Sequence, residues 1–149
     1  MSAVSITLQG ADASTISRIE TLLAENGLPT ADVRSNPSHF FLAFDGGDRV
    51  GVGGLERYGD AGLLRSLVVE ESARGLGYGT AICDALADRA RADGVETLYL
   101  LTTTAEDFFA ARGYEPIDRD AVPEVIRETP EFADLCPASA VCMRRSPET

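Results

Sequence analysis

Arg74-Gly75-Leu76-Gly77-Tyr78-Gly79 lies between an apolar run, 63–69, and a segment with apolar residues at helical spacing, 81–92. This arrangement predicts a strand, a glycine-rich turn and the start of a helix. Glycines at alternate positions let the backbone turn tightly and direct several N–H groups at one point, at the positive end of the helix. Such a point binds phosphate groups, so the stretch indicates a phosphate site.

Two better-known phosphate loops do not fit the stretch. The loop G-x-x-x-x-G-K-[ST] requires a lysine, and the chain contains none. The dinucleotide fingerprint G-x-G-x-x-G requires a third glycine where this chain has Thr80 or Ile82. Both loops are therefore excluded.

The pattern R-x-x-G-x-G does fit, as Arg74, Gly77 and Gly79 after a strand that ends in Leu-Val-Val-Glu. Here the chain resembles the GNAT superfamily of acetyl-CoA-dependent N-acetyltransferases, whose pyrophosphate-binding motif has this pattern. The alternative is an ordinary glycine-rich turn between a strand and a helix. The resemblance implies acetyl-CoA as the acetyl donor, with these residues as its binding site: Leu67, Val68, Val69, Arg74, Gly75, Leu76, Gly77, Tyr78, Gly79, Thr80, Thr102 and Phe109.

The order of predicted elements supports the resemblance. Hydrophobic periodicity and turn residues predict strands at 4–8, 40–44, 49–58, 61–69, 95–101, 114–117 and 140–143. The first predicted helix is capped by Asp12 and has Ile16, Ile19, Leu22 and Leu23 as its apolar stripe. The order is completed by a loop or short helix at 28–33, helices at 81–93 and 104–112, and a partly helical excursion at 121–132. We therefore expect a single α/β (α+β) domain over 1–149, with a mostly antiparallel mixed sheet of about seven strands and about four helices.

The family's C-terminal signature, N-x-x-A-x-x-F-Y-x-x-x-G-F, also aligns with this chain. It falls on Thr102, Ala105, Phe108, Phe109, Gly113 and Tyr114. At Phe109 the family has a tyrosine that commonly protonates the leaving thiolate, and phenylalanine has no proton to give. This departure keeps open a second function, an acyl-CoA-binding sensor with little turnover.

Further stretches are similar to GNAT proteins encoded with arsenic-resistance operons. They are 54–56, 58–60, 63–67, 98–104 and 135–143. This resemblance implies transfer of acetyl to the primary amine of a small amino-acid-like acceptor by direct attack, and in some relatives the acceptor is an organoarsenical. Acetylation of a protein terminus or lysine is a third alternative. Because GNAT relatives are often dimers, a homodimer is the assembly to test.

Candidate proton-handling groups lie on the hairpin formed by 49–58 and 61–69. If Tyr58 opposes Ala61, then Glu56 lies diagonal to Arg65 on one face, with Tyr58 nearby. Glu56 is the general-base candidate, and Arg65 would orient it or bind a substrate carboxylate. The alternative is a surface ion pair that contributes little.

Two further residues are candidates for the catalytic site. Ser66 falls on the face opposite to Glu56 unless a β-bulge swaps the assignment. Cys136, before the last strand, is a candidate for proton transfer to the leaving thiolate or for binding trivalent arsenic; the alternative is a small buried residue beside a proline turn. A backbone N–H near Leu67 or Val68 would receive the negative charge that develops on the thioester oxygen.

Composition limits the other classes of partner. The net charge of −11 disfavours nucleic acid and anionic membranes, and no apolar stretch approaches the roughly 18 residues of a membrane span. Cys83, Cys136 and Cys142 form no metal-binding pattern, and His39, the only histidine, is expected to be no ligand. We expect a cytoplasmic protein without a metal, acting on a small-molecule amine.

The acidic excess predicts how stability depends on salt. The 24 acidic residues outnumber 13 basic ones, all arginine, which suggests adaptation to a salt-rich cytoplasm; a high-GC genome explains the missing lysine but not the acid. We expect the melting temperature to rise with KCl, because salt screens repulsion between surface carboxylates. Calorimetric melting from dilute buffer to molar KCl checks this, and a flat or falling melting temperature would reject halophilic adaptation.

Overall fold

The computed structural model describes residues 6–27, 30, 33–34, 37–73, 75, 77–102, 105–129 and 140–145. Its strands are β1 (Ile6–Gly10), β2 (Phe40–Asp45), β3 (Asp48–Tyr58), β4 (Ala61–Val69), β5 (Thr97–Thr102), β6 (Glu115–Ile117) and β7 (Val141–Arg145). Its α-helices are α1 (Ile16–Glu25), α2 (Tyr78–Ala92), α3 (Glu106–Ala111) and α4 (Glu124–Arg127), with short 3₁₀ turns η1 (Pro37–His39), η2 (Glu71–Ala73) and η3 (Arg119–Ala121).

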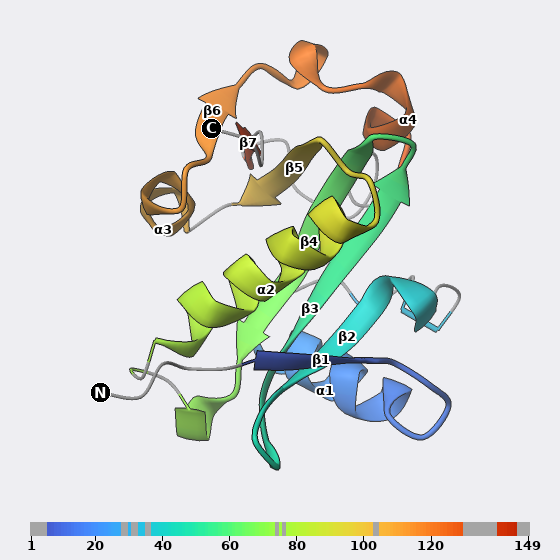
Figure 1. Ribbon diagram of the computed structural model, residues 1–149, viewed down its shortest axis with the longest axis vertical. Helices are drawn as coiled ribbons and strands as arrows, with labels where there is room; N and C mark the ends of the chain where they lie inside the picture. The colour runs from blue at the N-terminus through green and yellow to red at the C-terminus, as the bar shows by residue number, and fades with distance from the viewer. Residues whose placement is uncertain are drawn as a thin grey trace.

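The strands form one seven-stranded mixed sheet (Figure 1). Its order is β1-β2-β3-β4-β5-β7-β6, and only the pair β4–β5 is parallel. The predicted fold class, a mostly antiparallel mixed sheet with helices around it, is confirmed. The insertion of β7 between β5 and β6 was not predicted, since strand patterns along a sequence do not specify which distant strands pair.

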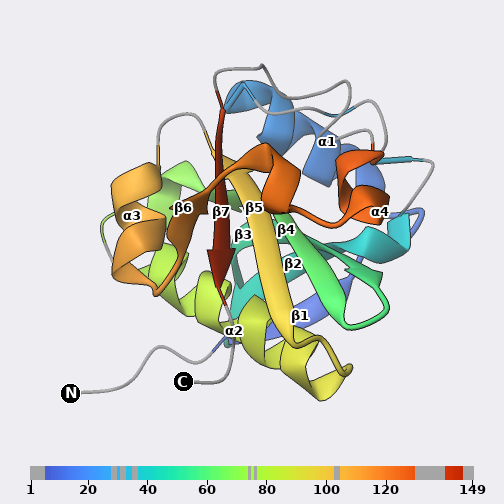
Figure 2. The same cartoon turned by 90° about the horizontal axis from the view of Figure 1, so that it is seen from above.

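Helices cover the two faces of the sheet (Figure 2). The apolar side of α2 packs on one face, where Ile82 and Leu86 are fully buried with Leu55, Leu64 and Leu98. The opposite face carries two apolar clusters. One includes the four buried residues of α1, and the other joins β4 and β5 to Val122 and Ile126 around α4. We call these the α2 face and the α1 face.

The first helix has its predicted apolar stripe but a different start. Ile16, Ile19, Leu22 and Leu23 are all buried, as predicted. Asp12 makes the contacts of a helix cap, as predicted: its carboxylate accepts hydrogen bonds from the N–H groups of Ser14 and Thr15, and its carbonyl accepts one from the N–H of Ile16. The regular helix starts later than Asp12, at Ile16, because a turn lies between them. Thr15 is the N-cap residue by position, and its side chain makes no capping hydrogen bond.

Three other predicted segments have different outcomes in the structure. The excursion at 121–132 resolves into the short helix α4 within its described part, and the partly helical prediction is correct there. The possible helix at 28–33 lies largely outside the described residues. The predicted strand at 4–8 begins at Ile6 and runs on to Gly10, where it pairs with Phe41 of β2.

The glycines of β3 let α2 pack closely on the sheet. A Cβ at Gly51 would lie 2.3 Å from the carbonyl oxygen of Val68 and 2.8 Å from Cδ1 of Ile82. A Cβ at Gly53 would lie 2.5 Å from Cδ1 of Leu86. Interiors at native packing density leave no room for such atoms. The Gly-rich run of β3 therefore sets the distance between the sheet and α2.

We expect Gly51→Ala to destabilise the fold by about 2 kcal/mol or more, because the added methyl meets backbone that cannot rotate away. Gly47→Ala is the control, since a Cβ at Gly47, in the exposed turn between β2 and β3, meets nothing within 4 Å. Chemical denaturation of both variants measures the free energy of unfolding. Equal stability of the two variants would contradict this account of the packing.

Candidate functional site

A β-bulge in β4 changes which face its side chains occupy. Val52 pairs with Val68 and Gly54 with Arg65, so one residue of β3 opposes two of β4. Ser66, one of those two, has a φ of 59°, the only positive φ among the described residues other than glycine. Before the bulge Arg65 lies on the α1 face, and after it Val68 does, while Leu67 packs with α2. The β-bulge that the sequence analysis considered at Ser66 is therefore present in the structure.

Glu56 is the centre of a polar cluster on the α1 face. It opposes Leu63 across the hairpin, as predicted, and is only 2% exposed. The Tyr58 hydroxyl donates a hydrogen bond to Oε1 of Glu56, and Nη1 of Arg65 donates to Oε2 at 3.0 Å. Nε of Arg65 donates to Oγ of Ser66 at 3.1 Å. All four predicted hairpin residues therefore lie together.

The Glu56–Arg65 pair is buried, so the alternative of a surface ion pair is wrong. The Arg65 side chain has no exposed surface and that of Glu56 is 3% exposed. Removing one partner of such a pair costs about 3–5 kcal/mol, because an uncompensated charge stays buried, whereas replacing both by apolar groups is often neutral. The pair is thus a poor choice for stability alone.

Three residues from β2, β3 and η1 complete the surroundings of the Glu56–Arg65 pair. Its guanidinium lies 5.2 Å from the centroid of the Phe40 ring, a cation–π contact. A Cβ at Gly54 would lie 2.9 Å from Cγ of Arg65, so only glycine leaves room there. His39, the residue before β2, has Nδ1 at 4.0 Å from Oε2 of Glu56. We call Glu56, Tyr58, Arg65, Ser66 and His39 the polar cluster.

Sequence reasoning did not place His39 in this cluster. In the sequence, His39 is marked only by its position before an apolar strand, which is typical of a residue at the edge of the hydrophobic core. The pairing of Phe40 with Gly54, and of Gly54 with Arg65, sets His39 at the level of the bulge. The contact between residues 39 and 56 depends on this register, which no local pattern gives.

The glycine-rich loop joins the end of β4 to the N-terminus of α2. Gly75 and Gly77 have φ values of 81° and 85°, in the left-handed region where glycine is favoured. Gly77 is the N-cap residue of α2, and a Cβ there would meet nothing within 4 Å. The hydroxyl of Tyr78 donates to Asp45 at 2.5 Å, which fixes the first turn of the helix and raises the pKa of Tyr78.

Three predicted site residues, Arg74, Leu76 and Cys136, lie outside the described residues. Gly79 and Thr80 follow Tyr78 in the first turn of α2 and are partly exposed. The helix N-terminus and the two left-handed glycines form the geometry that an anion-binding turn requires.

An acidic residue that the sequence analysis did not single out fixes the start of this loop. Glu70, directly after β4, accepts hydrogen bonds from Arg18 of α1 at 2.8 Å and from Arg49 of β3 at 2.5 Å. Its backbone N–H donates to the carbonyl of Val50 at 2.8 Å. A carboxylate held by two arginines at a strand end gives the loop a defined starting point.

Strands β4 and β5 diverge next to the loop. Their parallel ladder covers Ala61 to Leu63 of β4 and ends where Leu63 pairs with Tyr99. Beyond that point β4 turns through the bulge toward the loop, and β5 continues in its ladder with β7. Within the described residues the β4–β5 ladder therefore stops before Leu67 to Val69, and we call this end of the ladder the opening between β4 and β5.

The residues of the C-terminal signature have structural partners. Oγ1 of Thr102 accepts a hydrogen bond from the N–H of Ala105 at 3.0 Å. Phe109 is buried and packs edge-to-face against Phe108 and Tyr114. Phe108 reaches the start of α2, where its ring would lie 3.6 Å from a Cβ at Gly79. Phe108 and Phe109 have no ionisable proton, and burial raises the pKa of the Tyr114 hydroxyl.

The described cysteines are not reactive thiolates. Burial raises the pKa values of both Cys83 and Cys142 to about 11, so both stay protonated at neutral pH. Cys83 lies on the buried side of α2 and is fully buried, as predicted. Within the described ranges, no three acidic, histidine or cysteine side chains are grouped to hold a metal ion. In that same part of the chain, no helix has the length and apolar character to span a membrane.

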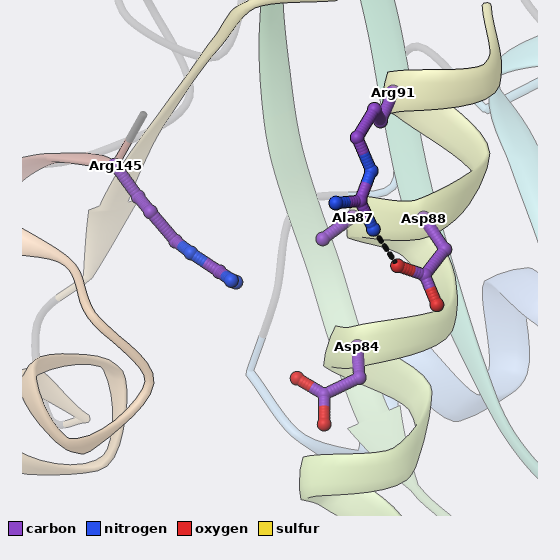
Figure 3. Close-up of a pocket in the computed structure, with 5 residues that line it drawn as sticks. All are labelled: Asp84, Ala87, Asp88, Arg91 and Arg145. Atoms are coloured by element: carbon purple, nitrogen blue, oxygen red, sulfur yellow. Dashed lines mark hydrogen bonds and ion pairs between the residues drawn. The ribbon is translucent and has the colours of Figure 1, made fainter. Parts of the chain in front are cut away.

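A cavity of about 310 Å³ lies away from the polar cluster, between the outer side of α2 and the end of β7 (Figure 3). Asp88 and Arg91 form an ion pair at its edge, and Arg145 extends toward α2 from β7. Its lining is charged and largely exposed. The cavity is lined by Asp84, Ala87, Asp88, Arg91 and Arg145, and none of these five residues belongs to the glycine-rich loop.

Known proteins resemble this chain in sequence and in fold. An amino-acid acetyltransferase of Neisseria meningitidis is 30% identical over 93 residues, 61% of this chain and 21% of that protein. One from Pseudomonas fluorescens is 39% identical over 64 residues, 43% of this chain and 15% of that protein. The chain thus spans about a fifth of the length of the curated relatives that it matches, or less.

Solved structures share the fold. N-acetylglutamate synthase from Neisseria gonorrhoeae, complexed with coenzyme A and N-acetyl-glutamate, matches with a TM-score of 0.83 and 22% identity over 99% of this chain and 36% of that one. An acetyltransferase of the GNAT family from Staphylococcus aureus matches with a TM-score of 0.76 and 18% identity over 97% of this chain and 100% of that one. At these identities the likeness shows the fold alone.

The family profile decides the assignment. The Acetyltransferase (GNAT) family matches residues 13–115, which include the polar cluster, the glycine-rich loop and the whole C-terminal signature. The resemblance inferred from the loop motif is confirmed at the level of the family, whereas the arsenic-resistance subgroup is not. This chain belongs to the Acetyltransferase (GNAT) family.

Proposed function

We propose that the chain transfers acetyl from acetyl-CoA to the primary amine of a small amino acid or amino-acid-like acceptor, by direct attack in a ternary complex. One observation carries the proposal: β4 contributes Arg65 and Ser66 to the polar cluster, borders the opening and leads into the glycine-rich loop. A donor held at the loop would meet an acceptor at the cluster. Family membership supports acetyl-CoA as that donor.

The donor site follows from the loop and the strand edge. The diphosphate of CoA would bind at the N-terminus of α2, with Gly75 and Gly77 allowing close backbone approach. The pantetheine would extend along β4 at 67–69, where its amides pair with the backbone. This places the thioester near the bulge, so that a backbone N–H near Leu67 receives the charge on the thioester oxygen. Arg74, Leu76 and Thr80 are proposed to belong to this site.

The acceptor site is proposed at the polar cluster. An amine is mostly protonated at neutral pH and must lose a proton before it attacks. Glu56 supplies a fixed negative charge for this step, and Arg65 holds the carboxylate in place rather than binding a substrate, since its side chain is fully buried. The names of the amino-acid acetyltransferase relatives support an amino acid as the acceptor.

Some finer predictions stay predictions. An amino-acid-like organoarsenical is a further acceptor to test, and Cys136 is the residue proposed to bind arsenic or to protonate the thiolate. The acidic composition supports the proposal that the chain works in a salt-rich cytoplasm. A homodimer and a single domain over 1–149 are proposed on the family resemblance.

A second function, an acyl-CoA-binding sensor, is favoured by one observation. Phe109 is buried between two aromatic rings and has no proton for the leaving thiolate. An enzyme would then need another proton donor, whereas a sensor would need none.

Acceptor-dependent release of CoA separates the two functions. We expect the purified chain to release free CoA from acetyl-CoA when an acceptor amine is present, measured with a thiol reagent over a panel of amino acids, amino phosphonates and organoarsenicals at low and high salt. Release with a lysine-bearing peptide alone would instead support acetylation of protein. Tight binding of acetyl-CoA without release across the panel would reject the transferase in favour of the sensor.

For the loop, we expect Gly77→Ala to weaken acetyl-CoA binding at least tenfold, because its Cβ would occupy the space that the diphosphate needs. Gly27→Ala is the matched control: Gly27 also has a left-handed φ and open space at its Cβ, but lies at the end of α1. Both variants carry similar backbone strain. Calorimetric titration measures the affinity, and equal binding by a folded Gly77→Ala protein would contradict the donor site.

A further inference from the structure

His39 is the one member of the polar cluster with an unsatisfied buried atom. Its Nδ1 is shielded from solvent and, within the described part of the chain, makes no hydrogen bond. That atom lies 4.0 Å from Oε2 of Glu56, slightly beyond hydrogen-bond distance. In enzymes without bound substrate, catalytic hydrogen bonds are often long and tighten in the complex.

Glu56 itself is poorly placed to contact an acceptor. Both of its oxygens already accept hydrogen bonds, from Tyr58 and from Arg65. The carboxylate is also almost fully buried, so an amine arriving from solution has little access to it. Arg65 cannot take a proton, because a guanidinium is permanently protonated.

The imidazole of His39 bridges this buried charge and the solvent. Its side chain is 31% exposed, although Nδ1 is covered. Phe40, the next residue, pairs with Gly54, which pairs with Arg65, so that His39 lies level with the bulge at Ser66. The proposed thioester position is at this level of the sheet.

We propose that His39 is the catalytic base of acetyl transfer, with its Nδ1–H directed at Glu56 and its Nε2 receiving the proton of the acceptor amine. This inference rests on the proposed function and assigns the proton-accepting atom within it. The arrangement is that of a base oriented by a carboxylate, in which the carboxylate fixes the tautomer and stabilises the imidazolium. Glu56 is then a positioning residue that acts through His39.

The proton and electron balance is complete without another reactant. The ammonium gives one proton to Nε2, and the free amine attacks the carbonyl carbon to form the C–N bond. The C–S bond then breaks and its electron pair leaves on the CoA sulfur as a thiolate. The second proton of the attacking nitrogen neutralises that thiolate, and the imidazolium releases its proton to solvent from its exposed edge.

The charged groups around His39 are few. The elements that pack most against η1 are β1 and β3. Strand β1, with the sequence ITLQG, has no titratable side chain, and β3 brings Glu56 and Tyr58. Arg65 reaches the cluster from β4 on the other side of Glu56. Among these described groups, the carboxylate is therefore the charge nearest to the imidazole.

One test needs no activity, because His39 is the only histidine of the chain. In the untagged protein labelled with ¹⁵N-histidine, long-range ¹H–¹⁵N spectra at alkaline pH report which nitrogen carries the proton. We expect the Nδ1–H tautomer in the wild type and a return to the Nε2–H tautomer of free imidazole in Glu56→Gln. An Nε2–H tautomer in the wild type would overturn the proposal, whether or not Glu56→Gln folds.

The kinetic test uses His39→Asn, which keeps a donor toward Glu56 but has no nitrogen that accepts a proton. We expect kcat to fall by about 10²-fold or more while acetyl-CoA affinity is unchanged, and the acidic limb of the pH–rate profile to disappear. Added imidazole is expected to restore part of the rate in His39→Gly. Ser38→Ala, at an exposed neighbour in η1, is the control and should keep the wild-type rate and profile.

The outcomes separate this inference from the proposed function. If the wild type releases CoA with an acceptor but His39→Asn keeps its rate and its acidic limb, His39 is structural and the inference alone is wrong. If the wild type releases no CoA with any acceptor, the proposed function fails and the inference fails with it.

Discussion

The bulge at Ser66 is the constraint on which the rest of the site depends. Two residues of β4 oppose one of β3 there, and Ser66 has a backbone conformation that costs a non-glycine residue of order 1 kcal/mol or more. Without the extra residue, a strand with period two would keep odd-numbered side chains on the α1 face along its whole length. Arg65 precedes the extra residue and faces Glu56 in either case, whereas Glu70, an even-numbered residue after it, faces Arg18 of α1 only because of the bulge. The contact of Ser66 with Arg65 and the fixed start of the loop both need this change of face.

The buried pair of Glu56 and Arg65 shows how the fold accommodates a costly feature. Desolvating two charges costs several kcal/mol per ion, which hydrogen bonds and Coulomb attraction offset only in good geometry. Here the carboxylate accepts from Tyr58 and Arg65, and the guanidinium also contacts Ser66 and the ring of Phe40. Gly54 leaves the space in which the arginine lies. So many partners for one pair indicate that the position of the charge matters more than its contribution to stability.

The sequence predicted the elements well because the periodic signal is strong where apolar faces are buried. The apolar stripe of α1, the limits of β4 and the pairing of Glu56 with Leu63 all follow from local patterns and a tight turn at 59–60. It also predicted that Glu56, Tyr58 and Arg65 would lie together, because cross-strand neighbours in a hairpin follow from its register. It left open whether the Glu56–Arg65 pair lies on the surface, since burial depends on what covers the sheet, and the structure shows the pair buried. Asp12 caps the turn that leads into α1, as predicted, but the sequence did not show that the regular helix starts only at Ile16.

The sequence by itself determined the family, through the spacing of Arg74, Gly77 and Gly79 after an apolar strand, because backbone conformation at glycine and helix termini is a local property. It also determined which hairpin residues meet, since a short turn fixes their register. Only the tertiary structure decided the position of β7 between β5 and β6, the face on which each residue of β4 lies after Ser66, and the approach of His39 to Glu56. These features depend on contacts between segments far apart in the chain, whose geometry is set by packing of the whole sheet between its helices.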